Sequence, residues 1–217
     1  MARNSAGTTW EATRAARLAL ADALDGAGPA SWDVPSWCSG WRVRDVVGHV
    51  TANAEGAFVL HRALPGLARH HFSVDAFLLA DGRRRGAAEP ATLIGRLRHA
   101  AGGRFRPPGR TPADVLCDVL VHTQDALRPI GSQCHPPAGA LRIALDRTAP
   151  ANSPPARNRA AGLRLRATDL DWAWGAGPEV TGPALDLLLA VTGRAAALGT
   201  LTGSGVPVLA ARQPAAN

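Results

Sequence analysis

Three side chains of metal-binding type occur at spacings that could bring them together. Asp118 and His122 are four residues apart, so on an α-helix their side chains lie one turn above the other and can hold one cation between them. His49 lies at the edge of the apolar stripe of another expected helix, and a helical bundle could turn it toward that pair. The spacing favours a metal site with ligands from two helices. A histidine on a helix flank is also commonly a hydrogen-bonded packing residue, and spacing alone leaves that alternative open.

Other polar residues near these positions have weaker claims. Asp125 shares the polar line of Asp118 and His122, where it could orient a ligand or simply be solvated. Asp45, near the start of the His49 helix, is expected to serve that helix's dipole. Cys117 points about 100° away from Asp118 around the helix, so it is not counted as a ligand.

Aromatic residues and the remaining thiols have structural interpretations. Trp37 and Trp41 flank the entry to the His49 helix and are expected to pack in the core, although a tryptophan there could also wall a ligand pocket. The adjacent pair His70 and His71 is expected in a solvated turn. The cysteines are odd in number and widely spaced, which predicts reduced thiols rather than a disulfide framework. They are Cys38, Cys117 and Cys134.

Hydrophobic periodicity predicts the helices that position these residues. The expected helices cover residues 8–24, 43–58, 72–79, 91–101, 112–127 and 138–147. The first of them carries Thr13 and Arg17 as polar exceptions on its apolar stripe. Thr111 is expected to cap the 112–127 helix, with Pro112 in its first turn. The basic run at residues 83–85 is expected in a loop.

The pattern changes after residue 150. A linker-like stretch at 151–160 is followed by alternating apolar and polar residues at 163–168 and 170–174, which predicts strands. A helix over 183–197 and a short apolar run at 206–210 complete this part. The sequence therefore predicts a mainly α protein, with a helical bundle over residues 1–150, a linker over 151–160 and a small α+β domain over 161–217.

Composition excludes several classes of protein. The chain has 217 residues, 46% of them hydrophobic, and no short repeat, which excludes disordered, collagen-like and solenoid designs. It has no uncharged apolar stretch of membrane-spanning length and no apolar secretion signal, so we expect a cytoplasmic protein with no membrane partner. All 24 basic residues are arginine, and they are dispersed rather than clustered. We therefore attribute the net charge of +7 to a GC-rich coding genome rather than to a nucleic-acid partner.

Three blocks of sequence resemble one known family. The segment 35–50, the segment 118–131 and the segment 171–194 appear in the order typical of the mycothiol-dependent maleylpyruvate isomerase family, a branch of the DinB-like metalloproteins. The first block contains Trp41-Arg42-Val43-Arg44-Asp45 and ends near His49. The second runs from Asp118 through His122 to Gly131, and the third from Asp171-Trp172 to Thr192-Gly193-Arg194. Together the blocks cover nearly the whole chain.

The resemblance implies a fold and a metal site. It implies a DinB-like four-helix bundle followed by a small α+β C-terminal domain, with one divalent metal, usually zinc, on His49, Asp118 and His122. The acidic ligand of the isomerase is glutamate, so Asp118 is one methylene shorter. The family pattern also implies that Arg194 faces the active site and holds a carboxylate. An arginine favoured by the dipole at a helix C-terminus is the alternative for that residue.

The resemblance also implies a reaction class. Three protein ligands leave a coordination position open, where a metal can stabilise the thiolate of mycothiol, the small thiol of actinobacteria. The expected protein is an isomerase or S-transferase acting on a small electrophilic metabolite, as a monomer or homodimer. The alternatives are a non-catalytic metal- or small-molecule-binding DinB-like protein, a metal-dependent hydrolase, and a basic nucleic-acid-associated protein, for which the sequence has no recognised motif.

Overall fold

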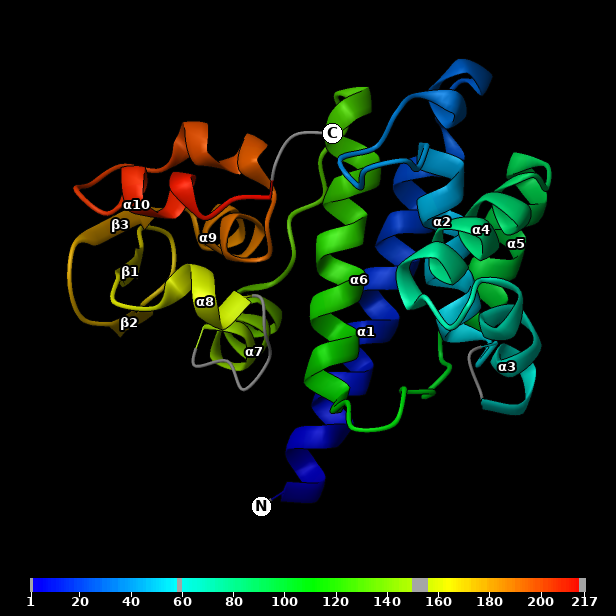
Figure 1. Cartoon of the computed structure of the whole chain (residues 1–217), viewed down its shortest axis with the longest axis horizontal. Helices are drawn as coiled ribbons and strands as arrows, with labels where there is room; N and C mark the ends of the chain where they lie inside the picture. Colours follow the sequence, from blue (N-terminus) through cyan, green and yellow to red (C-terminus); the bar gives the residue numbers. More distant parts are fainter. Residues whose placement is uncertain (1, 58–59, 150–155, 215–217) are drawn as a thin grey trace. The chain divides into compact units, whose positions relative to one another are not determined.

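The structure is a computed structural model that describes residues 2–57, 60–149 and 156–214 (Figure 1). Its contacts divide the chain into two compact units, Met1–His135 and Pro136–Asn217. The division precedes the 138–147 helix that the sequence analysis placed in the first domain, because that helix packs within the second unit. Of the expected linker at 151–160, residues 151–155 lie outside the described residues and Ala156–Ala160 form a short helix, α8.

Four helices of the first unit form a closed bundle. Helix α1 contacts α6, α6 contacts α2, α2 contacts α5, and α5 contacts α1, while α4 packs on the outside of α2. This arrangement confirms the predicted four-helix bundle. The elements of the unit are α1 (Ala2–Asp25), η1 (Pro29–Asp33), α2 (Val43–Ala54), α3 (Leu60–Arg69), α4 (Val74–Gly86), α5 (Pro90–Ala100), α6 (Pro112–Leu127) and η2 (Arg128–Ile130).

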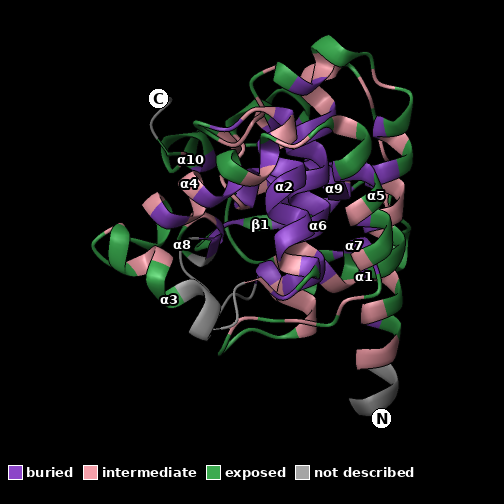
Figure 2. Cartoon of the chain, turned by 90° about the vertical axis from the view of Figure 1, so that its right-hand side faces the viewer, coloured by how far each residue is buried: buried purple, intermediate pink, exposed green. Residues whose placement is uncertain are grey.

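The bundle core is built from the apolar stripes that the sequence predicts. The stripe of α2 is fully buried at Val43, Val46, Val47 and Val50, and it meets α1, α5 and α6 side chains in one hydrophobic cluster. Its last expected member, Phe58, lies outside the described residues. Figure 2 shows the burial concentrated on α2, α6 and α9, whereas α3 is mostly exposed. Each large aliphatic side chain buried in this way stabilises the fold by about 1.5–3 kcal/mol.

Helix α6 begins and ends where the sequence predicts. The Thr111 hydroxyl accepts a hydrogen bond from the backbone N–H of Asp114 at 3.3 Å, and the Asp114 carboxylate accepts one from the backbone N–H of Thr111 at 2.6 Å. This reciprocal pair closes the N-terminus of the helix. Pro129 follows its last residues and contributes no backbone donor. The helix that carries Asp118 and His122 is therefore defined at both ends.

The structure differs from the prediction around α3 and α4. Helix α3, which contains Pro65, was not expected, and α4 is longer than the predicted 72–79 helix. The basic run 83–85 forms the last turn of α4 rather than a loop. Arginines suit that place because they face the negative end of the helix dipole, and Arg85 also pairs with Asp81 one turn back at 2.6 Å. The expected turn at His70 and His71 is present, with His71 at a φ of 52°.

A close approach between helices fixes the position of α2. Gly48 of α2 faces Gly86 of α4 so closely that a Cβ on Gly48 would lie 2.9 Å from the backbone nitrogen of Gly86. A Cβ on Gly86 would lie 2.3 Å from an Asp45 carboxylate oxygen. Helix α4 thereby holds α2 along the turn that precedes His49.

The second unit is a small α+β domain, as predicted. Its three-stranded sheet has the order β2-β1-β3, with β1 antiparallel to β2 and parallel to β3. Helix α9, buried along its whole length, contacts β1, β3 and α7. The elements, besides α8, are α7 (Ala138–Thr148), β1 (Arg164–Ala167), β2 (Ala173–Gly175), β3 (Glu179–Gly182), α9 (Ala184–Val191), η3 (Ala195–Thr200) and α10 (Val206–Ala211).

Two elements of this unit depart from the prediction. The expected helix over 183–197 stops at Val191, because Gly193 takes a φ of +98° that continues no α-helix, and η3 follows. Strand β3 was not predicted, and the apolar run at 206–210 forms helix α10. The predicted strand at 163–168 contains β1, and the predicted strand at 170–174 overlaps β2, which ends at Gly175.

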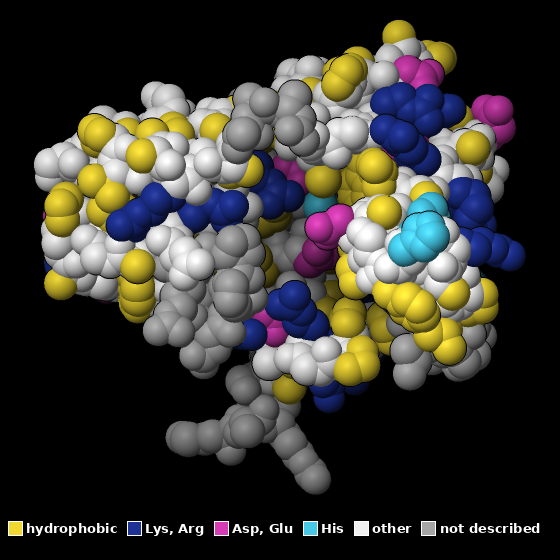
Figure 3. Space-filling model, in the orientation of Figure 1, with side chains coloured by type: hydrophobic (Ala, Val, Ile, Leu, Met, Phe, Trp, Pro, Cys, Tyr) yellow, Lys and Arg dark blue, Asp and Glu magenta, His cyan; other side chains and the backbone are white. Residues whose placement is uncertain are grey.

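Three features of the described residues concern helix length, the cysteines and the distribution of charge. No described helix is long and apolar enough to cross a membrane. All three cysteines are thiols, without a disulfide between them. On the face shown in Figure 3, the basic side chains lie in separate groups among apolar and acidic ones rather than in one continuous patch.

Candidate metal centre

The structure brings His49, Asp118 and His122 together. One ligand atom from each lies within 4.8 Å of the others. The distance from His49 Nε2 to Asp118 Oδ2 is 3.9 Å, and that from His122 Nε2 to Asp118 Oδ1 is 3.5 Å. Both histidines are buried, whereas the Asp118 side chain is 35% exposed. Two imidazoles and one carboxylate are a donor set that suits zinc and similar divalent ions, so these residues fit the implied metal.

Asn53 links the ligands, and the sequence analysis missed it. Its side-chain amide donates to Asp118 Oδ2 at 3.0 Å and lies 3.3 Å from His49 Nε2. Asn53 follows His49 by four residues on α2, so the two side chains share one face of the helix. That spacing is the sequence signal from which its place beside His49 could have been predicted. The bond holds the carboxylate of α6 against α2.

Asp125 orients His122. Its carboxylate, which is fully buried, lies 3.0 Å from His122 Nδ1. With the proton on Nδ1 donated to Asp125, the Nε2 lone pair of a neutral His122 points toward Asp118. A carboxylate behind a histidine is the usual arrangement around protein metal ions, because it fixes both the tautomer and the ring.

Burial and neighbouring charges shift the pKa values of the two histidines in opposite directions. Burial lowers the pKa of His49 to about 4, despite the attraction of Asp118. Burial also opposes the charged form of His122, but Asp118 and Asp125 together raise its pKa to about 9. In the metal-free protein at neutral pH, His49 is therefore a neutral ligand and His122 carries a proton that a metal must displace.

A buried arginine balances the charge of Asp118. Arg17 of α1 is fully buried, and its Nη1 donates to the carbonyl oxygens of Ala101 at 3.0 Å and Gly103 at 2.7 Å. Burial lowers its pKa to about 10, against the attraction of Asp118. The sequence showed Arg17 only as a polar exception on an apolar stripe. The structure places this cation in the electrostatic environment of the candidate ligand.

Trp41 forms one wall of the centre. Its ring centroid lies 4.9 Å from that of His49 and 5.9 Å from that of His122. The residue is buried in the bundle core, as expected. It therefore belongs to the hydrophobic core and also lines the candidate metal centre. The same expectation is wrong for Trp37, which is half-buried, with the guanidinium of Arg128 5.3 Å from its ring centroid.

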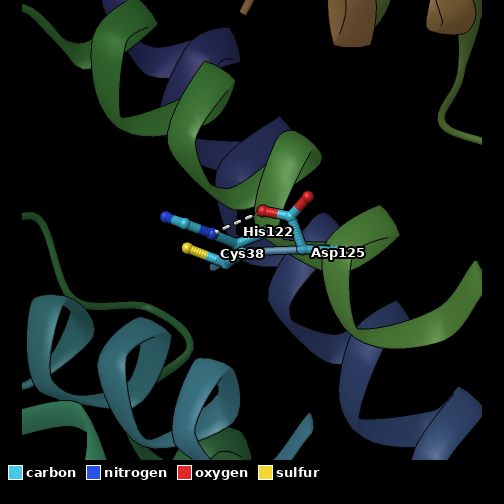
Figure 4. A group of neighbouring side chains, drawn as sticks. All are labelled: Cys38, His122 and Asp125. Carbon is cyan, nitrogen blue, oxygen red and sulfur yellow. Dashed lines mark hydrogen bonds and ion pairs between the residues drawn. The ribbon is translucent and has the colours of Figure 1, made fainter. Parts of the chain in front are cut away.

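Cys38 is a second residue that the sequence analysis missed. Its Sγ lies within 4.8 Å of a ring nitrogen of His122 and a carboxylate oxygen of Asp125 (Figure 4). Among the residues that the structure describes, Cys117 belongs to neither group of candidate ligands. The exclusion of Cys117 from its helical angle is consistent with this geometry.

Two further candidates have local partners. Asp45 accepts hydrogen bonds from the backbone N–H of Arg42 at 3.0 Å and from its guanidinium, so it closes the start of α2. Arg194 lies just beyond α9, where its Nη1 donates to the carbonyl oxygen of Thr192 at 2.9 Å. That bond agrees with the alternative in which Arg194 serves the C-terminal end of the helix. The binding of a substrate carboxylate by Arg194 stays a prediction.

A scan against protein families matches residues 13–130 to the family described as "Mycothiol maleylpyruvate isomerase N-terminal domain". The chain belongs to this family. The matched segment includes His49, Asp118 and His122, and the match confirms the resemblance found in the sequence. Membership also confirms the expectation of an enzyme of the isomerase or transferase type.

Solved structures show the same fold. The crystal structure of a mycothiol-dependent maleylpyruvate isomerase aligns with a TM-score of 0.63 and 16% identity, covering 91% of this chain and 92% of that chain. The crystal structure of a histidine-to-alanine mutant of the isomerase aligns equally well. No curated protein sequence matches the chain.

Proposed function

We propose that this protein is a divalent-metal-dependent, mycothiol-using isomerase or S-transferase that acts on a small electrophilic metabolite. The observation that carries the proposal is the convergence of His49, Asp118 and His122 at one point of the bundle, where both histidines are buried and Asp118 is partly exposed. Membership in the family and the likeness to a mycothiol-dependent maleylpyruvate isomerase support it.

The three converging residues would hold the metal, which we propose to be zinc. A divalent ion there supplies a positive charge that stabilises a thiolate at neutral pH. Asp125 holds His122 in the ligating tautomer, and Asn53 restrains the carboxylate of Asp118. Trp41 packs against both histidine rings, so the partly exposed side of Asp118 is the open approach for a thiol and an electrophile.

Mycothiol, when bound, would supply the nucleophile, since a thiol can add reversibly to an electrophilic carbon. An isomerase releases the thiol again after a bond rotation, whereas an S-transferase releases the adduct.

Arg194 is our proposed anchor for a substrate carboxylate, on the strength of its match to the family's C-terminal block. A bidentate guanidinium binds a carboxylate in a way that lysine does not reproduce. We expect Arg194→Lys to raise KM for a carboxylate substrate by roughly tenfold, about the contribution of one charge-assisted hydrogen bond. An unchanged KM together with an unchanged kcat would assign Arg194 to the end of α9 alone.

The proposed function is tested by thiol binding to metal-loaded and metal-free protein. We expect mycothiol to bind with a measurable heat only when zinc is present, since the proposed thiolate needs the ion's charge. Calorimetry with cysteine as a smaller thiol controls for the sugar part of mycothiol. Stoichiometric zinc without binding of either thiol would overturn the proposal and favour a metal-dependent hydrolase or a non-catalytic binding protein.

A further inference from the structure

Cys38, His122 and Asp125 form a group that the proposed reaction does not use. Figure 4 shows the Cys38 sulfur beside the His122 ring, with the Asp125 carboxylate on the Nδ1 side of that ring. Their ligand atoms lie within 4.8 Å of one another. Asp125 is fully buried, His122 is 9% exposed, and Cys38 is half-buried. The group is therefore reached from the side of Cys38.

The loop that carries Cys38 is fastened to α6. The backbone N–H of Trp37 donates to the carbonyl oxygen of Asp125 at 3.1 Å. That carbonyl is available because Pro129, its partner in a regular helix, has no N–H. The residue before Cys38 is thus joined through the backbone to Asp125 itself.

Hydrogen bonds also hold the loop from within. The backbone N–H of Cys38 donates to Ser36 Oγ at 3.1 Å, and the carbonyl oxygen of Cys38 accepts from the backbone N–H of Trp41 at 3.1 Å. The backbone N–H of Ser36 donates in turn to the carbonyl oxygen of Trp41 at 2.9 Å. Cys38 is therefore presented to α6 by an ordered turn.

The chemistry of the group suits a soft divalent ion. A thiolate and a carboxylate together carry two negative charges, which neutralise a divalent cation in a buried place where an unbalanced charge is costly. Ligand atoms on a tetrahedral zinc at about 2.0–2.3 Å lie roughly 3.3–3.8 Å from one another, and the three atoms here lie within 4.8 Å, so closing the group needs a movement of about 1.5 Å at most. A thiolate favours thiophilic ions over magnesium or calcium.

We propose that Cys38, His122 Nδ1 and Asp125 form a second metal position, for a thiophilic divalent ion, which shares His122 with the His49–Asp118–His122 centre. The two positions use opposite nitrogens of one ring. A neutral imidazole offers only one lone pair for a metal, so the two positions are alternatives for a single ion. The second position does not rest on the proposed function, since it needs neither a thiol cofactor nor a substrate.

The test uses cobalt as the probe, because a thiolate ligand gives Co²⁺ an intense near-ultraviolet charge-transfer band that histidine and carboxylate ligands do not give. The His49→Ala variant removes the first position and leaves the second complete. We expect this variant to bind one Co²⁺ with the thiolate band. The band should be lost in His49→Ala/Cys38→Ser and kept in His49→Ala/Cys117→Ser, the matched control from α6.

A second measurement covers the case in which the double variants do not fold. Alkylation of the wild-type thiols is followed by mass spectrometry with and without Cd²⁺. We expect Cd²⁺ to slow the modification of Cys38 by at least about tenfold, since a metal-bound thiolate is a poor nucleophile, with Cys117 and Cys134 as internal controls. Absence of the cobalt band, its persistence without Cys38, or equal alkylation with and without Cd²⁺ would each overturn the second position. None of these results would affect thiol binding at the first centre.

Discussion

Replacing His49 or His122 by alanine is expected to lower the zinc affinity of the protein by at least about 100-fold, since even an outer partner of a ligand contributes 10–100-fold. Among the residues that the structure describes, three ligands converge at this point, so the loss of either imidazole leaves two. Asp118→Asn should act in the same direction, because it removes the negative charge while keeping the size of the side chain. The measurement is competition with a chelator of known affinity, on protein whose helical content is checked by circular dichroism.

The matched control is His99→Ala. His99 is an exposed histidine on α5, outside both candidate groups, so its removal should leave zinc affinity unchanged. Cys117→Ser provides a second control on α6 itself. To exclude zinc held by the second position, the comparison is made in the Cys38→Ser background. Zinc affinity that is equal there with and without His49→Ala or His122→Ala would mean that the three residues are an ordinary hydrogen-bonded cluster.

The bundle could be predicted because its helices carry local signals. Helix α6 has a threonine cap, a proline in its first turn and a proline after its end, and the structure reproduces both limits. Helix α3 has no such pattern and contains Pro65, which argues against a helix in isolation. The run of arginines in α4 looks like a loop from its charge, but tertiary partners such as the carbonyl oxygen of Gly40, which accepts a hydrogen bond from Arg83 Nη2 at 2.7 Å, stabilise it as a helical turn. Local rules fail where the stabilising partner is not local.

The same distinction applies to the candidate centre. The spacing of Asp118 and His122 is a property of one helix, so the sequence shows it directly. Arg17 and Cys38 come from another helix and from a loop, and neither has a spacing relation to α6. Cys38 lies near His122 in a loop that the Trp37 N–H fastens to the Asp125 carbonyl, which Pro129 leaves without its helical donor. Pro129 lies 91 positions after Cys38 in the sequence. A contact between such distant segments depends on the tertiary structure, and hydrophobic periodicity does not reveal it.

The charges around the centre explain why it could favour an anion once a metal is bound. In the metal-free protein the carboxylates of Asp118 and Asp125 are matched by Arg17 and by the protonated His122. A divalent ion adds two positive charges and displaces one proton. Counting these groups alone, the site then carries one net positive charge, which suits a thiolate. Arg17 thus makes the charge of the loaded centre positive rather than neutral.

The zinc affinity of the protein should rise with pH. The pKa of His122 is raised to about 9 in the metal-free protein, so at neutral pH zinc must displace a proton from this residue. Apparent affinity should therefore increase by about tenfold per pH unit below that pKa and level off above it. His49, whose pKa is lowered to about 4, is neutral throughout this range and adds no slope. The measurement is chelator competition between pH 6 and 9, corrected for the protonation of the chelator itself.

Proton release on zinc binding and the stability of the metal-free protein test the protonation of His122 independently of zinc affinity. Calorimetry in buffers of different ionisation enthalpy should show about one proton released per zinc at neutral pH. Because the folded pKa of His122 lies above its ordinary 6.5, its charged form stabilises the metal-free fold fully below that value, and this contribution is lost as pH rises toward about 9. Asp125→Asn removes one partner of the charged ring, so the levelling of zinc affinity should move to lower pH. A zinc affinity independent of pH in both proteins would contradict a protonated His122 at this centre, and with it the electrostatic coupling of His122 to Asp118 and Asp125.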